Sequence, residues 1–154
     1  MPVSVADMIG TPANASPKDL NEAITVGNKA TGAGSKIPVG RVAFEVSTGI
    51  WAICAAGSTP RFGVVPRLDP PNADTSSTVQ LVTQKNAEIY VEGNSAVKPG
   101  WYVVCDAAGK VKARAAEAID LCVGTYEGHY GEGRGHGTKA TDGAAGEAWR
   151  IKLI

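Results

Sequence analysis

The two histidines of this 154-residue chain, His129 and His136, are the first candidates for metal chemistry. They lie in one glycine-rich stretch, with Glu127, Glu132 and Asp142 close by in the sequence. A zinc site needs three or four such ligands at short range, and its sequence shows a recognisable ligand spacing. Nothing in the spacing resembles such a set, so the sequence predicts no metal site and two ordinary loop histidines.

The cysteines and Ser58 also lack the sequence context that a catalytic nucleophile needs. Cys54, Cys105 and Cys122 are each embedded in an apolar segment, which is typical of a small core side chain that lacks an activating base. Three cysteines cannot all pair within one chain, so we expect reduced, buried thiols. Ser58 lacks the G-x-S-x-G pattern of a catalytic serine. The alternating glycines at 131–137 are not followed by the helix that a dinucleotide-binding loop needs. We predict no catalytic residue, no cofactor and no enzyme.

The balance of charges argues against a nucleic acid as a binding partner. Lys and Arg number 15, Asp and Glu also number 15, and both signs are spread along the chain. Binding that depends on phosphate contacts needs a basic patch, which is missing here. No apolar run approaches the roughly 18 residues of a membrane span, and the first residues do not resemble a secretory signal. We expect no nucleic acid and no membrane partner, and synthesis in a cytoplasm.

The elements that would position any site are strands. From Arg41 onward, three segments alternate apolar and polar residues, which predicts strands with one buried and one solvated face. These segments are residues 41–46, 87–92 and 149–153. Three further segments are apolar on both faces and predict central strands, or strands at a contact between sheets or subunits. These are residues 50–56, 101–105 and 119–123.

Turn sequences separate these segments. Pro99-Gly100 suits a type II turn, and residues 106–109 suit a hairpin in which Gly109 takes a positive φ. Short strands divided by turns predict a mostly β protein with a small β-barrel or β-sandwich body.

The three tryptophans each lie in a predicted strand. They are Trp51, Trp101 and Trp149. Packing in the core is the preferred interpretation for all three, because a buried indole contributes a large apolar surface. A subunit interface, where tryptophan is enriched, is the alternative.

Residues 1–40 differ from the body at 41–154. They hold three prolines before position 20 and a run of small residues at 27–35, with few large apolar side chains. We predict an extended N-terminal arm that a partner orders, with a disordered tail as the alternative. At most one short helix is expected in it, with Ser16 as N-cap and Pro17 as first helical residue.

A second irregular stretch, residues 128–146, is rich in glycine. Ordering so many glycines is entropically costly, so this loop either stays mobile or is ordered by contacts outside its own domain. The predicted capsid or subunit interface takes its residues from the arm and this loop. These residues are Val3, Val5, Met8, Ile9, Leu20, Ile24, Val26, Tyr130 and His136.

Three stretches in a fixed order carry a resemblance to a known group. Residues 96–111 contain K-P-G, an apolar strand and D-x-x-G-K-V, residues 122–127 contain V-G, and residues 146–153 form a last strand that ends in leucine. From Val39 to its end, the chain resembles the small capsid decoration (cement) proteins of tailed bacteriophages. The glycine-rich loop is long for that group.

The resemblance implies a β-barrel or sandwich with an N-terminal arm, located in the virion on the outer capsid surface. The implied partner is the major capsid protein. Self-association as a trimer at local three-fold positions is also implied, as is stabilisation of the contacts between capsomers. Two alternatives remain. One is another virion part, such as a tail or head-completion protein. The other is a β-sandwich module that binds sugars or a host surface, which needs an exposed aromatic platform.

Overall fold

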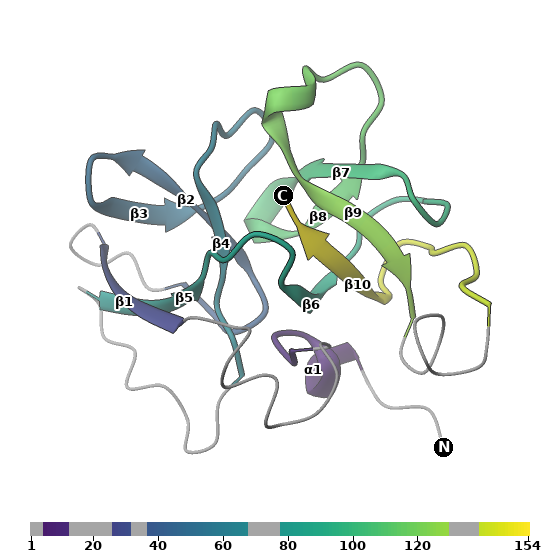
Figure 1. Cartoon of the computed structure of the whole chain (residues 1–154), viewed down its shortest axis with the longest axis horizontal. Helices are drawn as coiled ribbons and strands as arrows, with labels where there is room; N and C mark the ends of the chain where they lie inside the picture. The colour runs from purple at the N-terminus through teal and green to yellow at the C-terminus, as the bar shows by residue number, and fades with distance from the viewer. Residues whose placement is uncertain (1–4, 13–25, 32–36, 68–77, 130–138) are drawn as a thin grey trace.

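The computed structural model describes residues 5–12, 26–31, 37–67, 78–129 and 139–154. They form a mostly β structure with one short helix near the N-terminus (Figure 1). This confirms the predicted fold class. In chain order the elements are α1 (Val5–Met8), β1 (Val26–Thr31), β2 (Val42–Ser47), β3 (Ile50–Ile53), β4 (Phe62–Val64), β5 (Thr78–Val82), β6 (Glu88–Glu92), β7 (Tyr102–Cys105), the 3-10 turn η1 (Ala107–Gly109), β8 (Val111–Ala113), the 3-10 turn η2 (Ile119–Leu121), β9 (Cys122–Gly128) and β10 (Ala148–Leu153).

Five strands close into a small barrel in the order β1-β3-β2-β4-β5. β1 runs parallel to β3 and antiparallel to β5, and the other pairs are antiparallel. β1 lies inside the stretch predicted as an arm, so residues 26–31 take part in the hydrogen bonding of the barrel. The arm as a separate, partner-ordered unit stays a prediction. The short helix expected at Ser16 lies outside the described residues.

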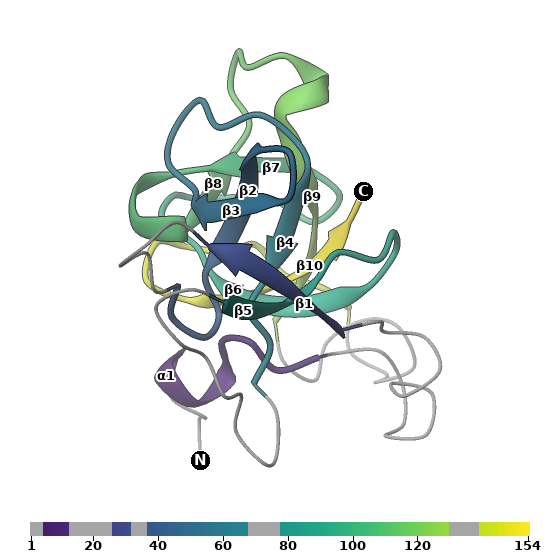
Figure 2. The same cartoon turned by 90° about the vertical axis from the view of Figure 1, so that its left-hand side faces the viewer.

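The other five strands form an antiparallel sheet in the order β6-β10-β9-β7-β8. This second sheet curls strongly, because a parallel bridge between Gly93 and Val111 joins the end of β6 to β8 at the far edge. Figures 1 and 2 show the curled sheet packed beside the barrel.

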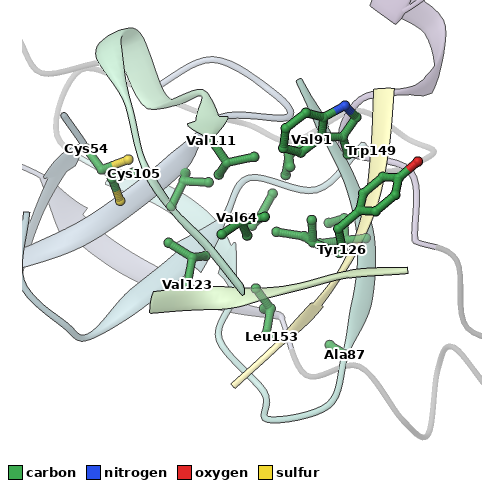
Figure 3. Close-up of a cluster of buried hydrophobic side chains, with 14 of the residues drawn as sticks. Cys54, Val64, Ala87, Val91, Cys105, Val111, Val123, Tyr126, Trp149 and Leu153 are labelled. Atoms are coloured by element: carbon green, nitrogen blue, oxygen red, sulfur yellow. The ribbon is translucent and has the colours of Figure 1, made fainter. Parts of the chain in front are cut away.

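One hydrophobic core joins the barrel to the second sheet (Figure 3). Val42, Cys54, Val64 and Val82 of the barrel pack with residues of the second sheet such as Val123. A smaller cluster around Trp51 fills the rest of the barrel. The two halves therefore form one body.

The hairpin between β7 and β8 inserts its tip into this junction. Gly109 has φ +75°, as the sequence predicts, and its N–H donates to the Cys54 carbonyl over 3.0 Å. A Cβ at Gly109 would lie 2.8 Å from the Arg41 Cβ, so a side chain here would push the halves apart. At the rim of the junction, the Glu92 carboxylate forms ion pairs with the Arg41 guanidinium (3.2 Å) and the Lys110 ammonium (3.1 Å).

The prediction that β2 has one wet face is wrong. Val42 points into the shared core, while its neighbour Ala43 is buried in the smaller cluster inside the barrel. Val46, predicted to be on the buried face, is 54% exposed. The strand separates two cores at its start and leaves both of them at its end.

The same prediction is wrong for part of β6 and β10, where Glu88, Tyr90 and Arg150 are buried while Glu92 and Lys152 stay partly exposed. Glu88 is 1% and Arg150 3% exposed, and the guanidinium Nε lies 3.4 Å from the carboxylate. An Arg150 NH2 group also donates to the Glu127 carbonyl over 2.7 Å. Tyr90, which pairs with Arg150 across β6 and β10, is also buried. The opposite charges compensate one another, which lets Glu88 and Arg150 be buried on the face that was predicted to be wet.

The turns are largely as predicted. Gly100 has φ +87° and the Trp101 N–H donates to the Lys98 carbonyl over 3.1 Å, so Pro99-Gly100 forms the expected turn. The segment 119–123, predicted as a strand, begins as the 3-10 turn η2, and β9 starts only at Cys122.

The tryptophans divide into two buried residues and one exposed residue. Trp51 and Trp149 are core residues, as predicted. Trp101 is 47% exposed, so the prediction of core packing is wrong for this residue. It precedes β7 in the turn at Pro99-Gly100, where the backbone leads the side chain away from the core.

Candidate interaction surfaces

Five of the predicted interface residues lie outside the described part of the chain: Val3, Leu20, Ile24, Tyr130 and His136. Val26 opens β1 and pairs through its backbone with Val82 of β5. Val5, Met8 and Ile9 lie in or next to α1. The structure therefore brings three of the predicted residues together, and they belong to one N-terminal segment.

This N-terminal segment, residues 5–12, is tied to its own chain. Gly10 donates to the Tyr90 carbonyl over 2.7 Å and the Tyr90 N–H donates back to Thr11 over 3.0 Å. The segment thus extends the second sheet beyond the edge of β6. Met8 is 6% exposed. Ile9 packs closely on Gly40, and a Cβ built on Gly40 would lie 2.6 Å from the Cβ of Ile9. Much of the predicted apolar contact surface of this segment already faces the body.

The most exposed large aromatic side chains in the described residues lie at the start of β7. Trp101 is 47% and Tyr102 41% exposed. Together with Gly100 and Arg114 they line an open hollow of about 300 Å3. The Lys98 ammonium lies 6.0 Å from the centre of the Trp101 ring, within the range of a cation–π contact.

A second hollow, of about 290 Å3, follows the junction between the barrel and the second sheet. Phe62 and Thr83 line it from the barrel side, and Ile119, Cys122 and Ile154 from the other. Ile119 and Ile154 are more than half exposed. Nothing in the sequence pointed to this hollow, because its residues come from four separate places along the chain.

The cysteines lie where the sequence places them, in the core. Cys54 and Cys105 come from the two halves of the molecule, and their sulfur atoms lie side by side (Figure 3). A hydrogen bond with Cys54 and burial raise the pKa of the Cys105 thiol far above its usual range. Burial likewise raises the pKa of Cys122. A protonated, buried thiol is a poor nucleophile, which fits the interpretation as core side chains.

The described end of the glycine-rich loop, residues 139–146, is held by its own body. The Tyr126 hydroxyl donates to the Thr141 carbonyl over 2.9 Å. His129 Nε2 lies 3.1 Å from the Asp142 carbonyl oxygen and 3.8 Å from the Glu147 carboxylate. Within the residues that the structure describes, no three possible metal ligands gather around this histidine or elsewhere.

The arrangement is that of two small β-barrel-like halves with surface hollows. Two solved structures share this fold. The head fibre gp8.5 N base of bacteriophage phi29 aligns with a TM-score of 0.54 and 11% identity, over 85% of this chain and 94% of that one. A chain in the capsid of Myoviridae phage XM1 aligns with a TM-score of 0.53 and 14% identity, over 94% of this chain and 88% of that one.

Both neighbours come from phage heads, so the resemblance noted in the sequence is confirmed at the level of the fold. No protein family and no curated protein matches the sequence itself. In the part of the chain that the structure describes, no helix is long and apolar enough to cross a membrane.

Proposed function

We propose that this chain is a structural protein of a phage virion that binds the outer surface of the capsid and stabilises contacts between capsomers. The observation that carries the proposal is the shared fold with two phage head structures, over at least 85% of this chain. The ordered series of turn motifs from residue 96 to the end supports it independently.

The chemistry of the described residues is consistent with this role. The thiols are buried, several charged groups form ion pairs, and the hollow beside Trp101 is open. A protein that acts by adhesion needs surfaces of this kind and a rigid body, and the shared core between barrel and sheet supplies the rigidity.

The partner in this proposal is the major capsid protein, which the chain contacts through its N-terminal stretch and the glycine-rich loop. The contact residues proposed are those predicted from the sequence, Val3, Val5, Ile9, Leu20, Ile24, Val26, Tyr130 and His136, with Met8 as a minor contributor because it is 6% exposed. Self-association as a trimer at local three-fold positions of the lattice belongs to the same proposal.

Binding to empty, expanded phage heads that lack decoration tests the proposal directly. The purified chain is mixed with such heads over a range of concentrations, and bound protein is measured after sedimentation. Saturation at hundreds of copies per head is the expected result. A linear, non-saturating uptake, or none, would overturn capsid binding.

A shortened chain tests the role of the arm. The cut belongs before Val26, because β1 is a barrel strand that must be kept. The chain from Val26 should bind heads more weakly, and circular dichroism checks that it is folded. If this cut unfolds the body, Leu20→Asp with Ile24→Asp replaces it, with Lys85→Asp on the exposed turn after β5 as the matched control. Unchanged affinity would exclude the arm and leave capsid binding standing.

The head-fibre neighbour favours a second candidate, the base of a projection from the head. A cement protein and a fibre base both bind the shell, but only a cement protein strengthens it. Heating decorated and bare heads separates the two. A higher temperature of shell disruption in decorated heads supports stabilisation, and an unchanged temperature at full occupancy supports the fibre base.

A further inference from the structure

The hollow beside Trp101 has no role in the proposed capsid contact. We propose that it binds an acidic saccharide, that is, a sugar unit that carries a carboxylate. Its lining consists of Gly100, Trp101, Tyr102 and Arg114, and its volume is about 300 Å3. That volume lies at the lower end of small-ligand sites and suits one or two sugar rings.

The backbone that carries the aromatic platform is held in place before any ligand arrives. Gly100 donates to the Tyr126 carbonyl over 2.8 Å, and the Tyr126 N–H donates to the Trp101 carbonyl over 2.9 Å. Arg114 donates its backbone N–H to the Tyr102 carbonyl over 2.9 Å. All four of the described lining residues are thus fixed to the sheet by their backbones. A preformed platform loses little entropy when it binds a ligand.

An exposed indole face suits a sugar ring for electrostatic reasons. The face of the ring carries negative charge density, and the C–H groups on one side of a sugar are weakly positive. Gly100 leaves the space beside the ring open, since a Cβ built on it would meet no atom within 4 Å.

The charges around the platform favour an acidic sugar over a neutral one. The Lys98 ammonium lies over the Trp101 ring and Arg114 lines the hollow, whereas no carboxylate of the described residues lines it. The Arg114 Nε–H donates to the Glu117 carbonyl over 2.6 Å, which orients a guanidinium that has four more N–H groups to donate. The Glu117 carboxylate itself accepts from the Ala115 N–H over 3.2 Å, within its own loop.

Size argues against a protein as the ligand. A standard protein interface contains about 20–30 residues on each side. Of the residues that the structure describes, four line this hollow, and the other large exposed apolar side chains, such as Val46 and Ile119, do not. Aromatic rings with a few polar groups in a small hollow are typical of a small-molecule site.

The hollow lies apart from the N-terminal segment. β7 and β8 lie on the side of the molecule away from α1 in both views (Figures 1 and 2). The start of β7 lies closer to the glycine-rich loop, because Val97 forms a β-bridge with Gly143. Saccharide binding by the isolated chain does not depend on which of these surfaces contacts the shell.

Fluorescence titration of the purified full chain tests the proposal. The probes are short oligomers of galacturonate, alginate and hyaluronate, with dextran oligomers of matched length as the neutral comparison. Trp101 is the exposed indole, while Trp51 and Trp149 are buried, so a change in emission reports on the hollow. Saturable binding of at least one acidic oligomer, about tenfold tighter than dextran, is expected.

Variants assign the binding to the hollow. Trp101→Ala should abolish saturable binding in calorimetry, and Arg114→Gln should raise the Kd of the acidic oligomer about tenfold, since one charge-assisted contact is lost. Ile119→Ala is the matched control, because this exposed apolar residue lines the other hollow. The thermal midpoint of each variant checks the fold.

Three outcomes would overturn the proposal. The first is that none of the acidic oligomers binds saturably, and the second is that dextran binds as tightly as they do. The third is that binding survives in a folded Trp101→Ala chain. None of these touches capsid binding, which is measured with heads and without saccharide.

Discussion

Trp149 and Trp101 each begin a predicted strand in the sequence, but they have opposite surroundings in the structure. Trp149 is 0% exposed, its Nε1–H donates to the Ala144 carbonyl over 3.0 Å, and its ring meets Tyr126 edge to face at 5.4 Å. Trp101 is 47% exposed and contacts a lysine. The ring of Trp149 packs in the shared core, and the ring of Trp101 is available to a ligand.

Glycines explain the difference. A Cβ at Gly93 would lie 1.9 Å from Cε2 of Trp149, and one at Gly143 would lie 2.9 Å from its Nε1. Both glycines are buried, and they leave the space that the indole fills. Beside Trp101 the neighbouring Gly100 serves the turn and leaves its space empty. A tryptophan is buried or exposed according to whether glycines from other parts of the chain make room for its ring.

Replacing Trp149 should produce the largest effect. Trp149→Ala should lower the free energy of unfolding by about 3–5 kcal/mol, because it leaves a cavity in the shared core. Urea unfolding followed by circular dichroism measures the loss, with Trp149→Phe as a milder companion that keeps a ring against Tyr126. A loss under about 1 kcal/mol would contradict the core role.

The buried ion pair on the same strands should be nearly as sensitive. Arg150→Met leaves the Glu88 carboxylate buried without its compensating charge, at a cost of about 3–5 kcal/mol. The double variant Glu88→Gln with Arg150→Met removes both charges and should recover much of that loss. Additive losses in the cycle would mean that the two side chains do not act as a pair.

Local sequence rules predicted much of the fold. The period of two located β2, β6 and β10, and turn chemistry located Gly100 and Gly109, because both signals depend only on near neighbours. The burial of Glu88 and Arg150 escaped prediction, since alternation cannot show that two opposite charges meet across neighbouring strands. The prediction that Ala43 faces solvent is wrong for a related reason. At its start β2 lies between two cores, so neither of its faces is solvated there.

The surfaces were harder to predict than the fold. The sequence named an aromatic platform as the feature that a sugar-binding module needs, and Trp101 was among the residues considered. Its exposure and its meeting with Arg114 depend on how β7 and β8 pair. The exposure of Trp101 could have been predicted from the K-P-G turn before it, because such a turn lies at the surface and places Lys98 and Gly100 beside the indole.

Gly93→Ala should have an intermediate effect and tests the explanation itself. The added methyl group overlaps the Trp149 ring, so a cost of about 1–3 kcal/mol is expected from overpacking. In a Trp149→Phe background the smaller ring leaves more room, and the cost of Gly93→Ala should fall. An equal cost in both backgrounds would mean that the backbone at Gly93, and not the indole, requires glycine.

The smallest effect on stability is expected at Trp101. Trp101→Ala keeps the backbone hydrogen bonds with Lys98 and Tyr126 and removes a mostly solvated ring, so the change should stay within about 0.5 kcal/mol. Acrylamide quenching provides the matching readout. The wild type should contain one accessible and two protected indoles, and the variant only protected ones. A loss above about 1 kcal/mol would mean that Trp101 supports the fold. The contrast with Trp149 would then be one of degree, and the aromatic platform would have a structural reason to exist.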